Sequence, residues 1–131
     1  MKSFQIITVV LLFIFLQACS KQNKTASSTD VTINVKSPIY GATYHNGDSV
    51  LVAASVSYDG ILHGYEVLVT DSSTGAVIYN VANHIHTNSF EIHAAFAVYA
   101  TTYNVLKLVI NTQIDHSGKN VNKIVYFKCN P

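Results

Sequence analysis

Residues 49–58 read SVLVAASVSY, and their alternation of apolar with small or polar side chains indicates a β-strand. Every second residue from Val50 to Val56 is apolar, so an extended chain places all of these side chains on one face. A strand with one apolar face buries that face against a second layer of structure. This stretch therefore predicts an all-β domain with a packed core.

Further segments show the same mixture of β-branched and aromatic residues, and clusters of Gly, Asn, Asp and Ser separate them. The other expected strands are residues 31–35, 64–70, 76–80, 89–98, 102–112 and 122–129. Turns are expected at Asp59-Gly60, at residues 72–75 and at residues 115–118. About seven strands with a turn signal roughly every 8–12 residues are typical of a β-sandwich.

Several of these signals follow one another in a fixed order. They are Ser37-Pro38, Gly41, Asn46-Gly47-Asp48-Ser49-Val50, Tyr103-Asn104-Val105-Leu106 and the turn at residues 115–118. This order resembles that of bacterial immunoglobulin-like and fibronectin-type modules, over nearly the whole of residues 31–131. The resemblance implies an immunoglobulin-like β-sandwich, although the Cys pair and core Trp of antibody domains are missing. Because such modules serve many roles, the fold alone assigns no activity.

Residues 1–18 have the composition of an export signal. Lys2 is followed by a largely apolar run from Ile6 to Leu16, whose 11 residues are too few to span a bilayer about 30 Å thick. The motif Leu16-Gln17-Ala18-Cys19 then resembles the lipobox of bacterial lipoproteins. The resemblance implies a diacylglycerol on Cys19, which would anchor the mature chain to a membrane.

The likeness to lipoproteins also implies a division of the chain and a location. Residues 1–18 would be the signal peptide, residues 19–30 the lipidated Cys and a polar, flexible tether, and residues 31–131 the sandwich. Ser20 follows the Cys and no carboxylate lies in residues 20–24, which favours an outer-membrane anchor with the domain facing the periplasm over the cell surface. An ordinary secretory signal or an uncleaved anchor would also place the domain outside the cytoplasm.

Composition and motifs argue against several classes of function. The net charge is only +1 and all eight basic residues are Lys, so nucleic-acid binding has neither an electrostatic basis nor the bidentate forks of Arg. No GxSxG elbow, glycine-rich phosphate loop, CxxC or HExxH occurs, so we expect no enzymatic activity. With Cys19 lipidated, Cys129 has no partner for an intrachain disulfide.

Six histidines are the main anomaly of the composition, and His84-Ile85-His86 is their densest group. In a strand, His84 and His86 project from the same face, roughly 6–7 Å apart, so that one metal ion can bridge them. Ile85 should point into the core, as should the alternating apolar residues from 90 to 96. Glu91 and His93 should therefore point outward, as the two imidazoles do.

A hairpin with its tip at residues 87–89 would bring these outward groups together, with Glu91 opposite His86 and His93 opposite His84. The sequence therefore predicts a metal site at His84, His86 and His93, with Glu91 as a fourth ligand. Imidazole and carboxylate ligands suit Zn(II) or Cu(II). Cu(I) is disfavoured, since the mature chain has no Met and only one Cys without lipid.

Other interpretations of the same residues remain open. The histidines are equally consistent with solvent-facing polar residues on a sheet that carries few charges. His63, next to Gly64, and His116, in the turn at residues 115–118, could instead meet at one end of the sandwich. Without a metal, the domain would be a structural or interaction module that binds an envelope protein or a glycan. A carrier of a small hydrophobic ligand would need a cavity between the sheets.

Overall fold

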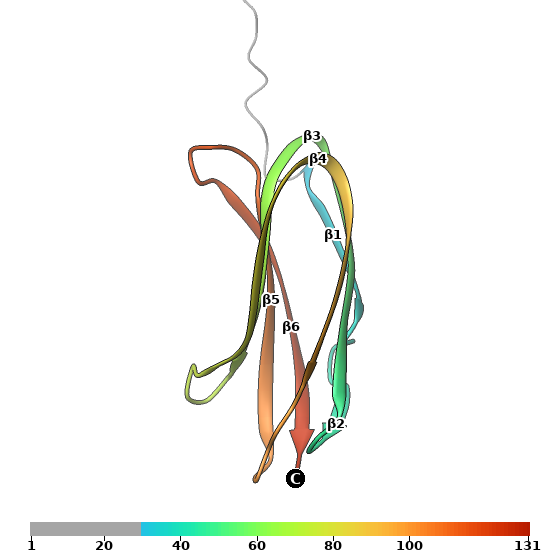
Figure 1. Ribbon diagram of the computed structural model, residues 1–131, viewed down its shortest axis with the longest axis vertical. Helices are drawn as coiled ribbons and strands as arrows, with labels where there is room; N and C mark the ends of the chain where they lie inside the picture. The colour runs from blue at the N-terminus through green and yellow to red at the C-terminus, as the bar shows by residue number, and fades with distance from the viewer. Residues whose placement is uncertain (1–29) are drawn as a thin grey trace, which may run out of the picture.

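The computed structural model describes residues 30–131, which form six β-strands. These are β1 (Thr32–Ser37), β2 (Thr43–His45), β3 (Ser49–Asp71), β4 (Val77–Ala97), β5 (Asn104–Gln113) and β6 (Asn120–Asn130). The two central strands are unusually long, at 23 residues for β3 and 21 for β4. Figure 1 shows both of them arching across one end of the domain, which we call the arch end. Among these described residues, no helix has the length and apolar character needed to cross a membrane.

The arch divides the strands into two facing layers (Figure 1). In the first layer, the first half of β3 pairs with β1 and with the second half of β4, so that Ser57 lies between Thr32 and Ser89. In the second layer, the second half of β3 pairs with the first half of β4 and with β5. β5 then pairs with β6, and β6 pairs with the short strand β2 at the edge. Two layers of mostly antiparallel strands make an immunoglobulin-like β-sandwich, and this confirms the predicted fold class.

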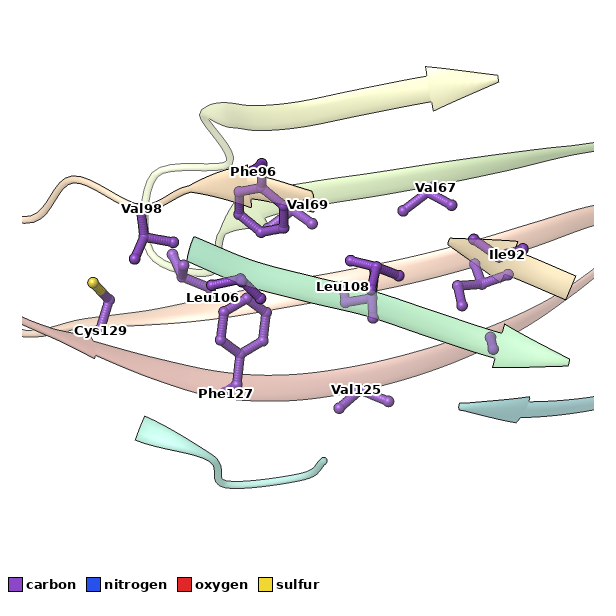
Figure 2. Packing of buried hydrophobic residues seen from close by; sticks show 14 of the residues in the cluster. Val67, Val69, Ile92, Phe96, Val98, Leu106, Leu108, Val125, Phe127 and Cys129 are labelled. Atoms are coloured by element: carbon purple, nitrogen blue, oxygen red, sulfur yellow. The ribbon is translucent and has the colours of Figure 1, made fainter. Parts of the chain in front are cut away.

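The core fills the space between the layers with the alternating apolar residues that the sequence singled out. Val50, Val52 and Val56 are at most 2% exposed, so the alternation in residues 49–58 is buried as predicted. Figure 2 shows Phe96 of the first layer and Phe127 of the second pointing into this space. Among the described residues, the buried core side chains lie between residues 50 and 129, and a fragment that begins at residue 20 contains all of these.

Aromatic pairs tie the two layers together near both ends of the long strands. The ring of Tyr65, on the second layer, stacks on Phe90 of the first layer with centroids 4.9 Å apart. Tyr79 and Phe96 make the same contact, also at 4.9 Å, between the first and second halves of β4. Such stacked pairs add to the stabilisation that comes from burying apolar area alone.

The structure corrects the expected number of strands. The predicted strands at residues 49–58 and 64–70 are one continuous strand, β3, and the predicted turn at Asp59-Gly60 lies inside it. Register shifts between Ser57 and Gly64 let β3 bend without ending. A Cβ on Gly60 would lie 2.5 Å from the ring of Tyr58, so a larger residue here would require the ring to move. The glycine makes room for an aromatic ring, and so its resemblance to a turn signal is misleading.

Cys129 lies in the core rather than at a reactive site. Its side chain is 1% exposed and packs in the same cluster as Phe127. Burial raises the pKa of the Cys129 thiol, and the carboxylate of Asp48 adds to this effect. Because the thiolate is the form that binds metals and attacks electrophiles, the raised pKa fits a packing role.

Asp71 holds the turn between β3 and β4. Its Oδ1 accepts hydrogen bonds from Ser73 Oγ at 2.6 Å, from Ser73 N at 2.8 Å and from Thr74 N at 2.9 Å. The hydrogen bond from the Ser73 hydroxyl contributes most to lowering the pKa of Asp71 to about 2, and the two backbone donors contribute further.

We expect the substitution Asp71→Asn to lower the melting temperature at pH 7, because the amide accepts these hydrogen bonds less strongly than the carboxylate does. A carboxyl whose folded pKa is depressed stabilises the fold above its unfolded pKa, which is near 3.8, and this stabilisation is lost as the pH falls through about 2. The difference in melting temperature between parent and variant should therefore shrink from pH 5 to pH 2. Thermal unfolding followed by circular dichroism measures it, and a difference that stays constant over this range would contradict the role of the ionised carboxylate.

Candidate metal centre at the arch end

Four histidines from three segments of the chain lie together at the arch end, and we call them the histidine cluster. His84 and His86 are on β4 before its bend, His63 is on β3 after its bend, and His116 is in the turn between β5 and β6. The ring centroids are 4.7 Å apart for His84 and His86, 5.0 Å for His63 and His86, 4.0 Å for His63 and His116, and 6.1 Å for His86 and His116.

Strand alternation accounts for the first pair. His84 and His86 are both exposed, while Ile85 between them packs against the core, as the sequence predicts. The Nε2 atoms of the two imidazoles are 3.0 Å apart, which is a hydrogen-bonding distance when one of them carries the proton. It is also close to the separation of about 3.3 Å between two nitrogen ligands of a tetrahedral zinc ion.

His63 is the most enclosed member of the cluster. Its Nδ1 is buried and has no hydrogen-bond partner. Burial is the main cause that lowers the pKa of His63, and the neighbouring imidazoles of His116, His86 and His84 lower it further. A neutral imidazole with an unpaired nitrogen is the form that binds a metal ion.

The turn that carries His116 is fixed by the residue before it. Asp115 Oδ1 accepts hydrogen bonds from Ser117 Oγ at 2.6 Å, from Ser117 N at 3.0 Å and from Lys119 N at 3.1 Å. These donors, with the Ser117 hydroxyl first, lower the pKa of Asp115. The ionised carboxylate thus holds the turn, which places the ring of His116 against that of His63.

Glu91 and His93 do not join His84 and His86, because the predicted hairpin tip at residues 87–89 is wrong. β4 continues through these residues, so Glu91 and His93 lie beyond the bend, on the first layer and opposite Ser55 and Ala53 of β3. Both side chains are exposed, as the alternation predicts, but they face outward from the opposite layer.

Glu91 has a different partner from the one that the sequence suggested. It accepts a hydrogen bond from Lys36 Nζ of β1 at 3.0 Å, and both side chains are about half exposed. An exposed ion pair of this kind contributes little to stability, at most about 1 kcal/mol. Glu91 therefore takes part in the surface of the first layer and has no contact that connects it to the histidine cluster.

The cluster brings ligands close together without holding them in coordination geometry. Within residues 30–131, no group of three or more His, Cys, Asp or Glu is placed so that it could hold a metal ion. Imidazoles bound tetrahedrally through one nitrogen each have ring centroids about 5 Å apart. The observed separations of 4.0–6.1 Å bracket this value. The side chains of His84, His86 and His116 are exposed, which leaves their rings room to change rotamer without movement of the backbone.

No protein-family model and no curated protein sequence matches this chain. Among solved structures, it is similar to fibronectin(III)-like modules of CbhA from Clostridium thermocellum, with a TM-score of 0.47 and 14% identity over 76% of this chain and 96% of that one. It is also similar to a CARDB domain from Pyrococcus furiosus in complex with di-metal ions, with a TM-score of 0.44 and 11% identity over 78% of this chain and 94% of that one.

Proposed function

We propose that this protein is a lipid-anchored extracytoplasmic module that binds Zn(II) or Cu(II) through the histidine cluster. The grouping of four imidazoles from three segments carries this proposal. Two of them already have nitrogens at nearly the spacing of metal ligands, and a third has a buried nitrogen without a partner. The ligand set keeps His84 and His86 from the sequence prediction and replaces His93 and Glu91 with His63 and His116.

The donor atoms determine which metals are expected. Imidazole nitrogens suit Zn(II) and Cu(II), whereas Cu(I) prefers the soft sulfur of Cys and Met. Cys129 has the only thiol among the described residues, and it is buried in the core near the end of β6. His116 lies just before the start of that strand, so the thiol is at the opposite end of β6 from the histidine cluster. Three histidines with a water molecule, or all four histidines, would complete a tetrahedral site.

The lipid anchor rests on the motif Leu16-Gln17-Ala18-Cys19, which lies outside the described residues. The segment from residue 20 to residue 30 can span at most about 40 Å when fully extended. β1 enters the sandwich at the arch end, where Thr32 pairs with Ser57. A lipid on Cys19 would therefore hold the histidine cluster close to the membrane, which in our proposal is the outer membrane and its periplasmic side.

Calorimetric titration of a fragment of residues 20–131 with Zn(II) and Cu(II) tests the metal site. At about pH 7.5, we expect saturable binding of one ion per chain. At about pH 5.5, below the ordinary histidine pKa of about 6.5, protons compete for each imidazole and the affinity should fall by at least about 100-fold. Weak binding of many ions that does not depend on pH would contradict the proposal. Metabolic labelling with a fatty acid, lost in a Cys19→Ala variant of the full chain, tests the anchor separately.

A further inference from the structure

The outer face of the second layer is hollowed beside the histidine cluster. The hollow has a volume of about 460 Å³, and residues of β3, β4, β5 and β6 line it. This volume is within the range of roughly 300–1,000 Å³ that is usual for ligand sites. We call this hollow the amide trough, because Asn111, Gln113 and Asn120, which carry side-chain amides, are among its lining residues.

The strand register explains why the surface is low at this place. Gly64, which has no side chain, lies between His84 of β4 and Gln113 of β5. In the next row on the same face, Glu66 lies beside Ala82, which has the smallest side chain after glycine. Small residues in adjacent rows form the floor, and the longer polar side chains around them form the walls.

The floor at Gly64 could not be filled without strain. A Cβ on Gly64 would lie 3.1 Å from the backbone oxygen of Asn83 and 3.6 Å from Oε1 of Gln113. The first of these distances is tight for a real Cβ contact, so glycine is favoured here by close backbone approach as well as by the hollow above it.

The side chains of the trough have hydrogen-bonding capacity that the protein leaves unused. Among the described residues, the side-chain amides of Asn111 and Asn120 have no hydrogen-bond partner. Gln113 donates from Nε2 to the backbone oxygen of Asp115 at 3.0 Å, which leaves its Oε1 available. Glu66 Oε1 accepts a hydrogen bond from Asn80 Nδ2 at 2.7 Å, which holds the carboxylate in place. Each free amide offers both donors and an acceptor to a ligand.

The lining also argues against charged and apolar ligands. Glu66 is its carboxylate, and none of its residues is Lys or Arg, so a phosphate or carboxylate ligand would meet no permanently cationic side chain there. Its walls carry Asn, Gln and Glu rather than large aliphatic groups, so a bound lipid would bury little of its apolar surface against apolar side chains. Neutral hydroxyl groups, which both donate and accept, match this set of amides.

We propose that the amide trough binds a neutral saccharide through hydrogen bonds from Asn111, Gln113 and Asn120 to its hydroxyl groups. This inference goes beyond the proposed metal site, which shares only His84 with the trough. Since the hydrogen bonds come from Asn111, Gln113 and Asn120, saccharide binding would not require metal in the histidine cluster.

The trough is tested by titrating the fragment of residues 20–131 with cellotetraose, maltotetraose, xylotetraose and chitotetraose in the presence of EDTA. Two-dimensional NMR separates the side-chain amide signals of Asn and Gln from those of the backbone. We expect at least one of these sugars to bind with a dissociation constant of about 1 mM or lower and to shift the side-chain signals of Asn111, Gln113 and Asn120. If none of the four binds at that concentration, or if a bound sugar shifts other side chains instead, the proposal is overturned.

Variants provide a matched comparison. Asn111→Ala should weaken binding about tenfold, and Ala82→Ile should abolish it by filling the floor with a side chain that suits an exposed strand. Asn122→Ala is the control, because Asn122 is the neighbour of Asn111 across the β5–β6 pairing but does not line the trough. Equal weakening by Asn111→Ala and Asn122→Ala would overturn the site.

Zinc binding separates this inference from the proposed metal function. Asn111→Ala should retain the parent's zinc affinity, and His86→Ala should retain the parent's saccharide affinity, since His86 does not line the trough. If the parent binds a sugar but no metal, the metal proposal alone fails. If it binds metal but none of the sugars, the trough alone fails.

Discussion

Replacing Phe127 with alanine is expected to lower the free energy of unfolding by about 3–5 kcal/mol. Phe127 is 1% exposed and points from β6 into the space between the layers (Figure 2). The ring of Tyr44 lies edge-on against it, with centroids 5.7 Å apart. Removal of the ring leaves a cavity that two strand layers cannot easily close. Since domains of this size are stable by about 5–15 kcal/mol, the loss would remove a large share of the total stability.

Urea unfolding of the fragment of residues 20–131 measures this loss, and the adjacent residue provides the control. Tyr126 is 40% exposed and faces outward from β6, so Tyr126→Ala should cost less than about 1 kcal/mol. A shift of β6 by one residue would exchange the two side chains between core and surface. Equal losses in the two variants, or a larger loss for Tyr126→Ala, would therefore contradict the observed register of β6 against β5.

The second large effect is expected at His86, the member of the histidine cluster with the most ring neighbours. Its ring lies within 4.7–6.1 Å of those of His84, His63 and His116. We expect His86→Ala to weaken zinc binding by at least about 100-fold, because even residues that only support a metal ligand typically change affinity by about 10–100-fold. Calorimetric titration at about pH 7.5 measures the affinity, and circular dichroism confirms that the exposed substitution leaves the fold intact.

His93→Ala is the matched control for this variant. His93 is also an exposed histidine of β4, but it lies opposite Ala53 on the first layer. Its removal should change zinc affinity by less than about twofold. If His93→Ala weakened binding as much as His86→Ala, the ligands would be those that the sequence predicts, with His93 among them. The proposed site at the arch end would then be wrong.

The fold could be predicted from local patterns wherever one strand face is buried. The alternation from Val50 to Val56 shows which side chains are buried, and the same pattern holds in β5 and β6. The predicted turn at Asp59-Gly60 is wrong because a glycine that gives space to the ring of Tyr58 has the same sequence signature as a glycine that turns the chain. β3 pairs with β4 on either side of that segment, at Ser57 and at Leu62, and continues through it as one strand.

The site was predictable only in part for a related reason. The outward direction of His84 and His86 follows from the two-residue period of a strand, which is local information. Residues 87–89 have the polar composition of a hairpin tip, yet Thr87 pairs with Leu62 and Ser89 with Ser57, so they continue the strand across the arch. The sequence left open that His63 and His116 meet at one end of the sandwich, but it could not show that this is the end where His84 and His86 lie.

The most direct measurement is NMR of the histidine ring signals during a zinc titration of the fragment of residues 20–131 at about pH 7.5. A site at the arch end predicts that the signals of the histidine cluster shift together and stop shifting at one zinc ion per chain. The signals of His45 and His93, which lie outside the cluster, should stay unchanged. A shift of His93 together with His84, a gradual shift of all six histidines, or no shift at all would contradict metal binding at the arch end.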